Sequence, residues 1–169
     1  EAEATARAIA MAEMAGAPLY VVHLSCAAAL AHVTAARDRG LPVHAETCPQ
    51  YLFLSMAEYD RPGFEGARYV MSPPLREAAD QEALWRGLAG RDLQLFAPAR
   101  CPSALAAEAR GRDDSSKVPA GAPGIETRMM LLWDGGVRAG RIDAQRFVDL
   151  TAAAPARIFC LWPHKGTIA

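Results

Sequence analysis

The stretch Pro18-Leu19-Tyr20-Val21-Val22-His23-Leu24-Ser25 decides the fold of this chain. It is short, apolar and β-branched at its centre, and an alanine-rich helical pattern follows it. These features are typical of a buried parallel strand in an α/β protein. A histidine at the carboxyl end of such a strand is expected at the edge of the sheet where α/β barrels carry out their chemistry. His23 is therefore the first candidate functional residue.

Helical and strand-like patterns alternate along the whole chain, as a parallel α/β fold requires. Apolar residues at helical spacing predict helices over residues 1–16, 27–39, 77–88, 125–135, 143–151 and 152–158. Short apolar runs predict strands over residues 18–25, 41–48, 68–71 and 93–97, with another beginning near 161. A long polar connection occupies residues 110–124, and such loops are commonly functional or disordered. The predicted fold is α/β, in one domain over residues 1–169.

Composition limits the classes of partner. The chain has 169 residues, of which 51% are hydrophobic, so it can bury a core. Its formal net charge of −1 gives no electrostatic reason to bind nucleic acid or an anionic membrane. No apolar stretch approaches the ~20 residues that cross a bilayer. The acidic start is not a signal peptide, and the missing initial Met indicates a processed or excerpted chain.

The four cysteines, Cys26, Cys48, Cys101 and Cys160, are far apart and form no C-x-x-C pair. We therefore expect reduced, isolated thiols rather than a disulfide framework or a zinc knuckle. A cytoplasmic location follows as the default expectation.

Other candidate residues have competing interpretations. His23 taken alone could be a core histidine, and Glu46 could be either a functional buried carboxylate or a hydrogen-bonded structural acid. Cys101 has no His/Asp pattern around it that would indicate a nucleophile. The glycine-rich residues 111–124 lack the spacing of a phosphate-binding loop. The remaining histidines, which show no ligand pattern, are His32, His44 and His164.

Five short segments form an ordered series. They are Val21-Val22-His23-Leu24-Ser25, Ala45-Glu46-Thr47-Cys48-Pro49-Gln50-Tyr51-Leu52, Ser72-Pro73-Pro74-Leu75-Arg76, Pro123-Gly124-Ile125-Glu126-Thr127-Arg128 and Lys165-Gly166-Thr167-Ile168-Ala169. In this order they resemble the hydantoinase/dihydropyrimidinase family of the amidohydrolase superfamily, over essentially the whole chain. The resemblance implies the C-terminal portion of a (β/α)₈ TIM-type barrel, with the start of a C-terminal β-segment at about residues 161–169.

The resemblance also implies a two-zinc site that opens cyclic amides such as hydantoins and dihydropyrimidines. The ions would lower the pKa of a shared water so that a hydroxide exists at neutral pH, and would polarise the ring carbonyl. The family's ligands are a His-x-His pair, a carboxylated lysine, two later histidines and an aspartate on the last strand. His23 aligns with the second of the later histidines, and is the one metal ligand expected here. The chain has no His-x-His, and one histidine is far short of the ligands that zinc requires.

The last strand departs from the family pattern. Where the family typically has Thr-Asp-His-Cys-Pro, this chain has Pro98-Ala99-Arg100-Cys101-Pro102. Ala99 thus occupies the position of the aspartate, which binds metal and carries the proton, and alanine does neither. Arg100 adds a positive charge that opposes a dication. We therefore predict no catalytic residue in this chain and no retained zinc.

Two residues are expected at the substrate. The resemblance places Ser72 and Ala120 at the ring amide, through backbone groups. Ala120 stands where the family usually has asparagine. The expected partner is therefore a small cyclic amide.

Three functions follow from the resemblance. The first is a cyclic amidohydrolase by descent, expected to be inactive as it stands. The alternative is a non-catalytic assembly or scaffold protein, like the neuronal dihydropyrimidinase-like proteins, and Ala99 favours it. The third is binding of a cyclic amide without turnover. A partial barrel exposes a sheet edge and apolar helix faces, so we also expect a homo-oligomer or a companion chain.

Overall fold

A parallel sheet forms the centre of the molecule. The computed structural model describes residues 1–98, 111–112 and 114–167. The strands are β1 (Leu19–Val21), β2 (Val43–Thr47) and β3 (Leu95–Phe96). They are hydrogen-bonded in the order β1-β2-β3, and both pairings are parallel. The α/β class with parallel strands alternating with helices, predicted from the sequence, is confirmed.

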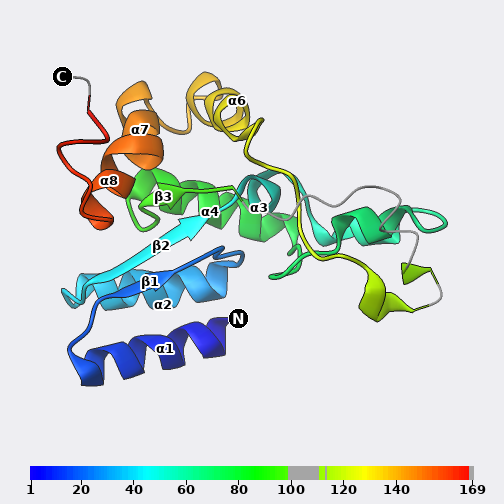
Figure 1. Ribbon diagram of the computed structural model, residues 1–169, viewed down its shortest axis with the longest axis horizontal. Helices are drawn as coiled ribbons and strands as arrows, with labels where there is room; N and C mark the ends of the chain where they lie inside the picture. The colour runs from blue at the N-terminus through cyan, green and yellow to red at the C-terminus, as the bar shows by residue number, and fades with distance from the viewer. Residues whose placement is uncertain (99–110, 113, 168–169) are drawn as a thin grey trace.

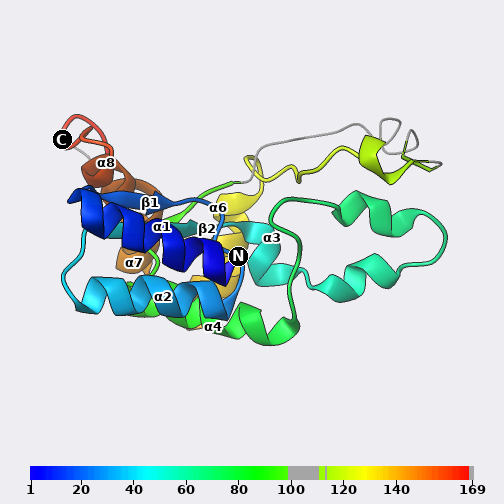
Figure 2. The same cartoon turned by 90° about the horizontal axis from the view of Figure 1, so that it is seen from below.

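Three helices pack in sequence order beside the sheet. They are α1 (Ala2–Ala15), α2 (Ala27–Asp38) and α4 (Ala78–Gly90). Helix α2 packs against both α1 and α4, and in Figure 2 α4 lies partly behind α2. Gly16 ends α1 at φ 61°, and Gly40 follows α2 at φ 81°. Only glycine adopts this left-handed conformation without a steric penalty, so both predicted helix ends are confirmed.

The C-terminal part of the chain is helical. Its elements are α6 (Arg128–Leu132), the π-helical η5 (Trp133–Arg138), α7 (Ala144–Val148), the π-helical η6 (Asp149–Ala153) and α8 (Ala154–Ile158). The side chain of Asp143 accepts a hydrogen bond of 2.6 Å from the Arg146 amide, which confirms Asp143 as the cap of α7. The helix predicted over residues 125–135 begins later, at Arg128.

An arm extends from the helical body (Figure 1). We define it as residues 55–74 with residues 111–112 and 114–124. It follows the short α3 (Pro49–Phe53) and contains the 3₁₀ helices η1 (Met56–Asp60), η2 (Glu65–Tyr69) and η4 (Ser115–Lys117). The Gly121 amide donates to the Val70 carbonyl at 3.0 Å, and the Arg112 guanidinium lies 5.5 Å from the centre of the Phe64 ring. The two parts of the arm therefore lie side by side.

Two predicted strands are wrong. Residues 68–71 lie in the arm, partly in η2, and no strand of the described sheet runs beside them to supply a hydrogen-bonded ladder. Residues 161–167 form turns, because the amides of Leu161 and Trp162 bond to the Ala156 carbonyl at 2.7 and 3.1 Å and wrap the chain around the end of α8. The interpretation of residues 161–169 as the lead-in to the family's C-terminal β-segment stays a prediction.

A buried arginine fastens α7 to the end of α4 and to the turn before β3. Only 7% of Arg146 is exposed. Its guanidinium donates to the Leu88 carbonyl at 2.7 Å and to the Leu93 carbonyl at 2.6 Å, and pairs with Asp149 at 2.5 Å. Arg146 therefore links α7 to the turn between α4 and β3.

Two further sequence expectations concern disulfides and membrane-spanning segments. Among the described residues, Cys26, Cys48 and Cys160 form no disulfide, as expected, whereas Cys101 lies outside them. No helix in the described ranges is both long enough and apolar enough to cross a membrane.

Candidate metal site

His23 lies at the carboxyl edge of the sheet, just beyond the end of β1 at Val21. Its backbone is left-handed, with φ 54°, which turns the chain at this point. The next residue is anchored to β2: the Leu24 amide donates to the Glu46 carbonyl at 2.9 Å, and the Thr47 hydroxyl donates to the Leu24 carbonyl at 2.8 Å. The predicted position of His23 at this edge is thus confirmed, although the regular strand ends two residues earlier.

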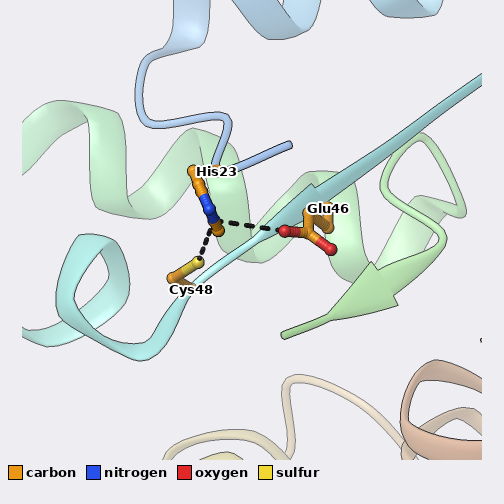
Figure 3. Close-up of side chains that lie close together, drawn as sticks. All are labelled: His23, Glu46 and Cys48. Carbon is orange, nitrogen blue, oxygen red and sulfur yellow. Dashed lines mark hydrogen bonds and ion pairs between the residues drawn. The ribbon is translucent and has the colours of Figure 1, made fainter. Parts of the chain in front are cut away.

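The imidazole ring is held through Nδ1. This nitrogen lies 3.1 Å from Oε1 of Glu46 and 3.2 Å from Sγ of Cys48 (Figure 3). Glu46 and Cys48 are two residues apart in extended backbone, so both side chains face His23. The side chain of His23 is 35% exposed, whereas that of Glu46 is 8% exposed. His23 is therefore not a core histidine, and Glu46 is a buried, hydrogen-bonded acid.

Tyr20 occupies the other oxygen of the same carboxylate. Its hydroxyl donates a short hydrogen bond to Oε2 of Glu46. Burial, and then the hydrogen bond to Glu46 and the charge of that carboxylate, raise the pKa of Tyr20 well above its ordinary value. Tyr20 therefore stays protonated and donates to Glu46, so that each oxygen of the carboxylate has its own partner.

The donor set fits a zinc ion chemically. One nitrogen, oxygen and sulfur atom of His23, Glu46 and Cys48 all lie within 4.8 Å of one another, and this is the one such trio within the described ranges. Zinc accepts all three ligand types, and its tetrahedral bond lengths place such ligands about 3.4–3.6 Å apart. A second arrangement is equally open to the ring: Glu46 and Cys48 hold Nδ1, and Nε2 binds the metal.

The loops that carry Ser72 and Ala120 meet in the arm. Both residues are exposed, and the bond from the Gly121 amide to the Val70 carbonyl joins their loops. The segment after Ser72 is fixed from two sides: the Tyr51 hydroxyl donates to the Pro73 carbonyl, and the Leu75 amide donates to the Tyr59 hydroxyl, both at 2.8 Å. The contact of Ser72 and Ala120 with a substrate stays a prediction.

A charged link joins this loop to the segment after His23. The Glu1 carboxylate accepts hydrogen bonds from the Ser25 amide at 2.8 Å, from the Ser25 hydroxyl, and from Nη2 of Arg76 at 2.8 Å. Nε of Arg76 also donates to the Ser25 hydroxyl at 3.0 Å. The link therefore fixes the end of the Ser72 loop relative to the candidate metal site.

Sequence reasoning found part of this site. It singled out His23 and Glu46 but missed the contact of Cys48 and the role of Tyr20. The two-residue spacing of Glu46 and Cys48 was a usable signal, because alternate residues of a strand share a face. Tyr20 gave no comparable signal. Ala99 and Arg100, which depart from the family pattern, and Cys101 lie outside the described residues.

Comparison with known proteins identifies relatives across the whole chain, although no family model matches it. The sequence is 54% identical to a D-hydantoinase of Streptomyces coelicolor and 45% identical to one of Rhizobium radiobacter, in each case over 100% of this chain. These alignments cover 36% and 37% of the relatives, so the chain spans little more than a third of their length.

Solved structures agree with the sequence comparison. A dihydropyrimidinase from Brevibacillus agri superposes with a TM-score of 0.97 at 47% identity. An L-hydantoinase from Arthrobacter aurescens superposes with a TM-score of 0.89 at 30% identity. Each comparison covers 99% of this chain and 37% of the other. The fold described above therefore corresponds to one contiguous part of these proteins.

Proposed function

We propose that this chain, which belongs to the hydantoinase/dihydropyrimidinase family, is the C-terminal portion of a (β/α)₈ barrel built for hydrolysis of cyclic amides, and that it has no such activity by itself. The observation that carries the proposal is the position of His23, held at the carboxyl edge of the sheet by Glu46 and Cys48. In α/β barrels this edge is where catalytic residues gather.

His23 is the metal ligand that the chain contributes. Because Nδ1 faces Glu46 and Cys48, we assign the metal-binding role to Nε2. A pair of zinc ions in the complete family site supplies a hydroxide at neutral pH. The loops of Ser72 and Ala120 would orient the ring amide through their backbone groups, and the Gly121 to Val70 bond holds these loops together.

Two deficits support the absence of activity. In the arrangement that uses Nε2 of His23, Glu46 and Cys48 hold Nδ1 and the chain supplies one ligand, whereas a zinc site needs three or four protein ligands. Ala99 stands at the position of the family's aspartate and has no group that binds metal or transfers a proton. The second deficit would persist if further chain completed the barrel.

The experiment is a combined metal and activity measurement on the purified 169-residue chain. We expect that dialysed protein holds less than one zinc per chain, and that it opens neither hydantoin nor dihydrouracil faster than a protein-free zinc blank. His23→Ala is the matched variant and should give the same blank rate. Two tightly held zinc ions together with turnover that His23→Ala abolishes would contradict the proposal.

Ala99 favours a second candidate, a non-catalytic role in which the fold serves assembly with further copies or a companion chain. The separate cysteines favour a cytoplasmic setting for either candidate. Adding a cyclic amide to the chain distinguishes a role in assembly alone from binding of the amide without hydrolysis. Assembly alone predicts no change in the protein NMR spectrum, whereas retained binding predicts shifts at Ser72 and Ala120.

A further inference from the structure

We infer that Glu46 is a positioning residue. It accepts a hydrogen bond from Nδ1–H of His23 and so fixes the ring in the Nδ1–H tautomer. Nε2 is then the nitrogen available to a metal. The inference rests on the proposed role of His23 as a ligand, but it concerns the ring itself and can be tested without any metal.

The geometry of the carboxylate supports this role. Oε1 of Glu46 lies 3.1 Å from Nδ1, within hydrogen-bond distance, and the side chain is almost completely buried. A buried carboxylate keeps its charge only with partners, and a donated N–H is such a partner. Among the described residues, Nε2 of His23 makes no hydrogen bond or ion pair.

Tyr20 determines which oxygen is free for the ring. Its hydroxyl donates to Oε2, so Oε1 is directed at His23. Tyr20 is itself held in the sheet, because it pairs with His44 in the register of β1 and β2. A carboxylate held at both oxygens cannot turn away from the histidine without loss of a hydrogen bond.

Cys48 is the competing partner. Its sulfur lies 3.2 Å from Nδ1, and a thiol is both a weak donor and a weak acceptor. If the thiol donated its proton, Nδ1 would be the acceptor and the ring would carry its proton on Nε2. The charged oxygen is the stronger acceptor, so the Nδ1–H form is expected to dominate.

The test is a long-range ¹H–¹⁵N correlation spectrum of the histidine rings in the metal-free 169-residue chain at pH about 8, where an ordinary histidine is neutral. A His23→Gln variant assigns the signals. We expect Nδ1–H to exceed Nε2–H by about tenfold or more, because hydrogen bonds to charged groups contribute at least about that factor. Cys48→Ala should keep this ratio, and Glu46→Leu should reverse it.

The inference is overturned if the wild-type ring carries its proton mainly on Nε2, or if Cys48→Ala reverses the ratio. Should Glu46→Leu not fold, the wild-type and Cys48→Ala spectra decide between the two acceptors. The tautomer ratio separates a positioning role of Glu46 from a purely structural one, because loss of packing alone does not favour one ring nitrogen over the other. Hydrolysis of hydantoin by the chain would contradict the proposed function and leave this result unchanged.

Discussion

Two histidines near β2 have opposite surroundings. His23 meets a carboxylate, whereas Nδ1 of His44 is buried with no hydrogen-bond partner in the described chain. Burial, and then the positive charge of Arg37, lower the pKa of His44 below its ordinary value of 6.5. A protonated ring at His44 is therefore less stable in the folded chain than in the unfolded one.

We expect this difference to appear as a pH dependence of stability. Between the lowered pKa of His44 and its ordinary value, the unfolded chain binds more protons than the folded chain, so the free energy of unfolding falls as the pH falls. His44→Leu should reduce this loss between pH about 7 and about 5. Urea unfolding of wild type and variant at both pH values measures the fall in the free energy of unfolding. An identical fall in the two proteins would contradict the expectation.

At this scale the sequence predicted some partners and missed others. His23 follows an apolar run and Glu46 lies in a recognisable strand, so both could be found by pattern. Tyr20 and Glu46 are 26 residues apart, and their contact depends on the register in which Tyr20 pairs with His44. Register comes from the packing of whole strands, and no local pattern in the chain determines it.

The elements of the fold were predicted best where local chemistry defines them. Glycine at positions 16 and 40 and aspartate at 143 mark helix boundaries through their own backbone or side-chain bonds. The segment 68–71 has the composition of a strand, but no strand of the described sheet lies beside it, and its conformation depends on tertiary contacts in the arm.

The attachment of α7 to α4 and to the turn before β3 depends on Arg146, and loss of this side chain should lower the stability of the fold. Arg146→Ala leaves the Leu88 and Leu93 carbonyls and Asp149 without the buried cation. We expect the free energy of unfolding to fall by about 3 kcal/mol. Arg141→Ala is the control, because Arg141 forms a more exposed pair with Glu82 at 2.7 Å, and it should lower the free energy of unfolding by clearly less than Arg146→Ala does. Equal losses in urea unfolding would contradict the expectation.

The whole molecule leaves apolar side chains uncovered. Met14 is 82% exposed, and Met11 on the same helix and Val22 beside β1 are also largely exposed. Strand β1 is an outer strand of the described sheet. Exposed apolar groups beside a free strand edge favour association.

We therefore expect the isolated chain to self-associate. Sedimentation velocity over about a hundredfold range of concentration should show a rising mean mass, as mass action requires. A Met11→Lys/Met14→Lys double variant should shift the association to higher concentration. A Met130→Lys variant adds the same kind of charge at an exposed methionine of α6. It is the control for an effect of added charge on association that does not depend on the α1 surface. A constant monomer mass across the range would contradict the expectation.

The two crossovers of the sheet differ in length, and the difference bears on how such a fold diverges. Leu19 pairs with Val43, whereas Glu46 pairs with Leu95, so the second connection is about twice as long and encloses part of the arm. Each doubling of a flexible loop costs only about 0.6 kcal/mol of closure entropy. Insertions and deletions in the arm part of this connection should therefore cost the sheet little, and the loop that carries Ser72 can change while the edge that carries His23 stays as it is.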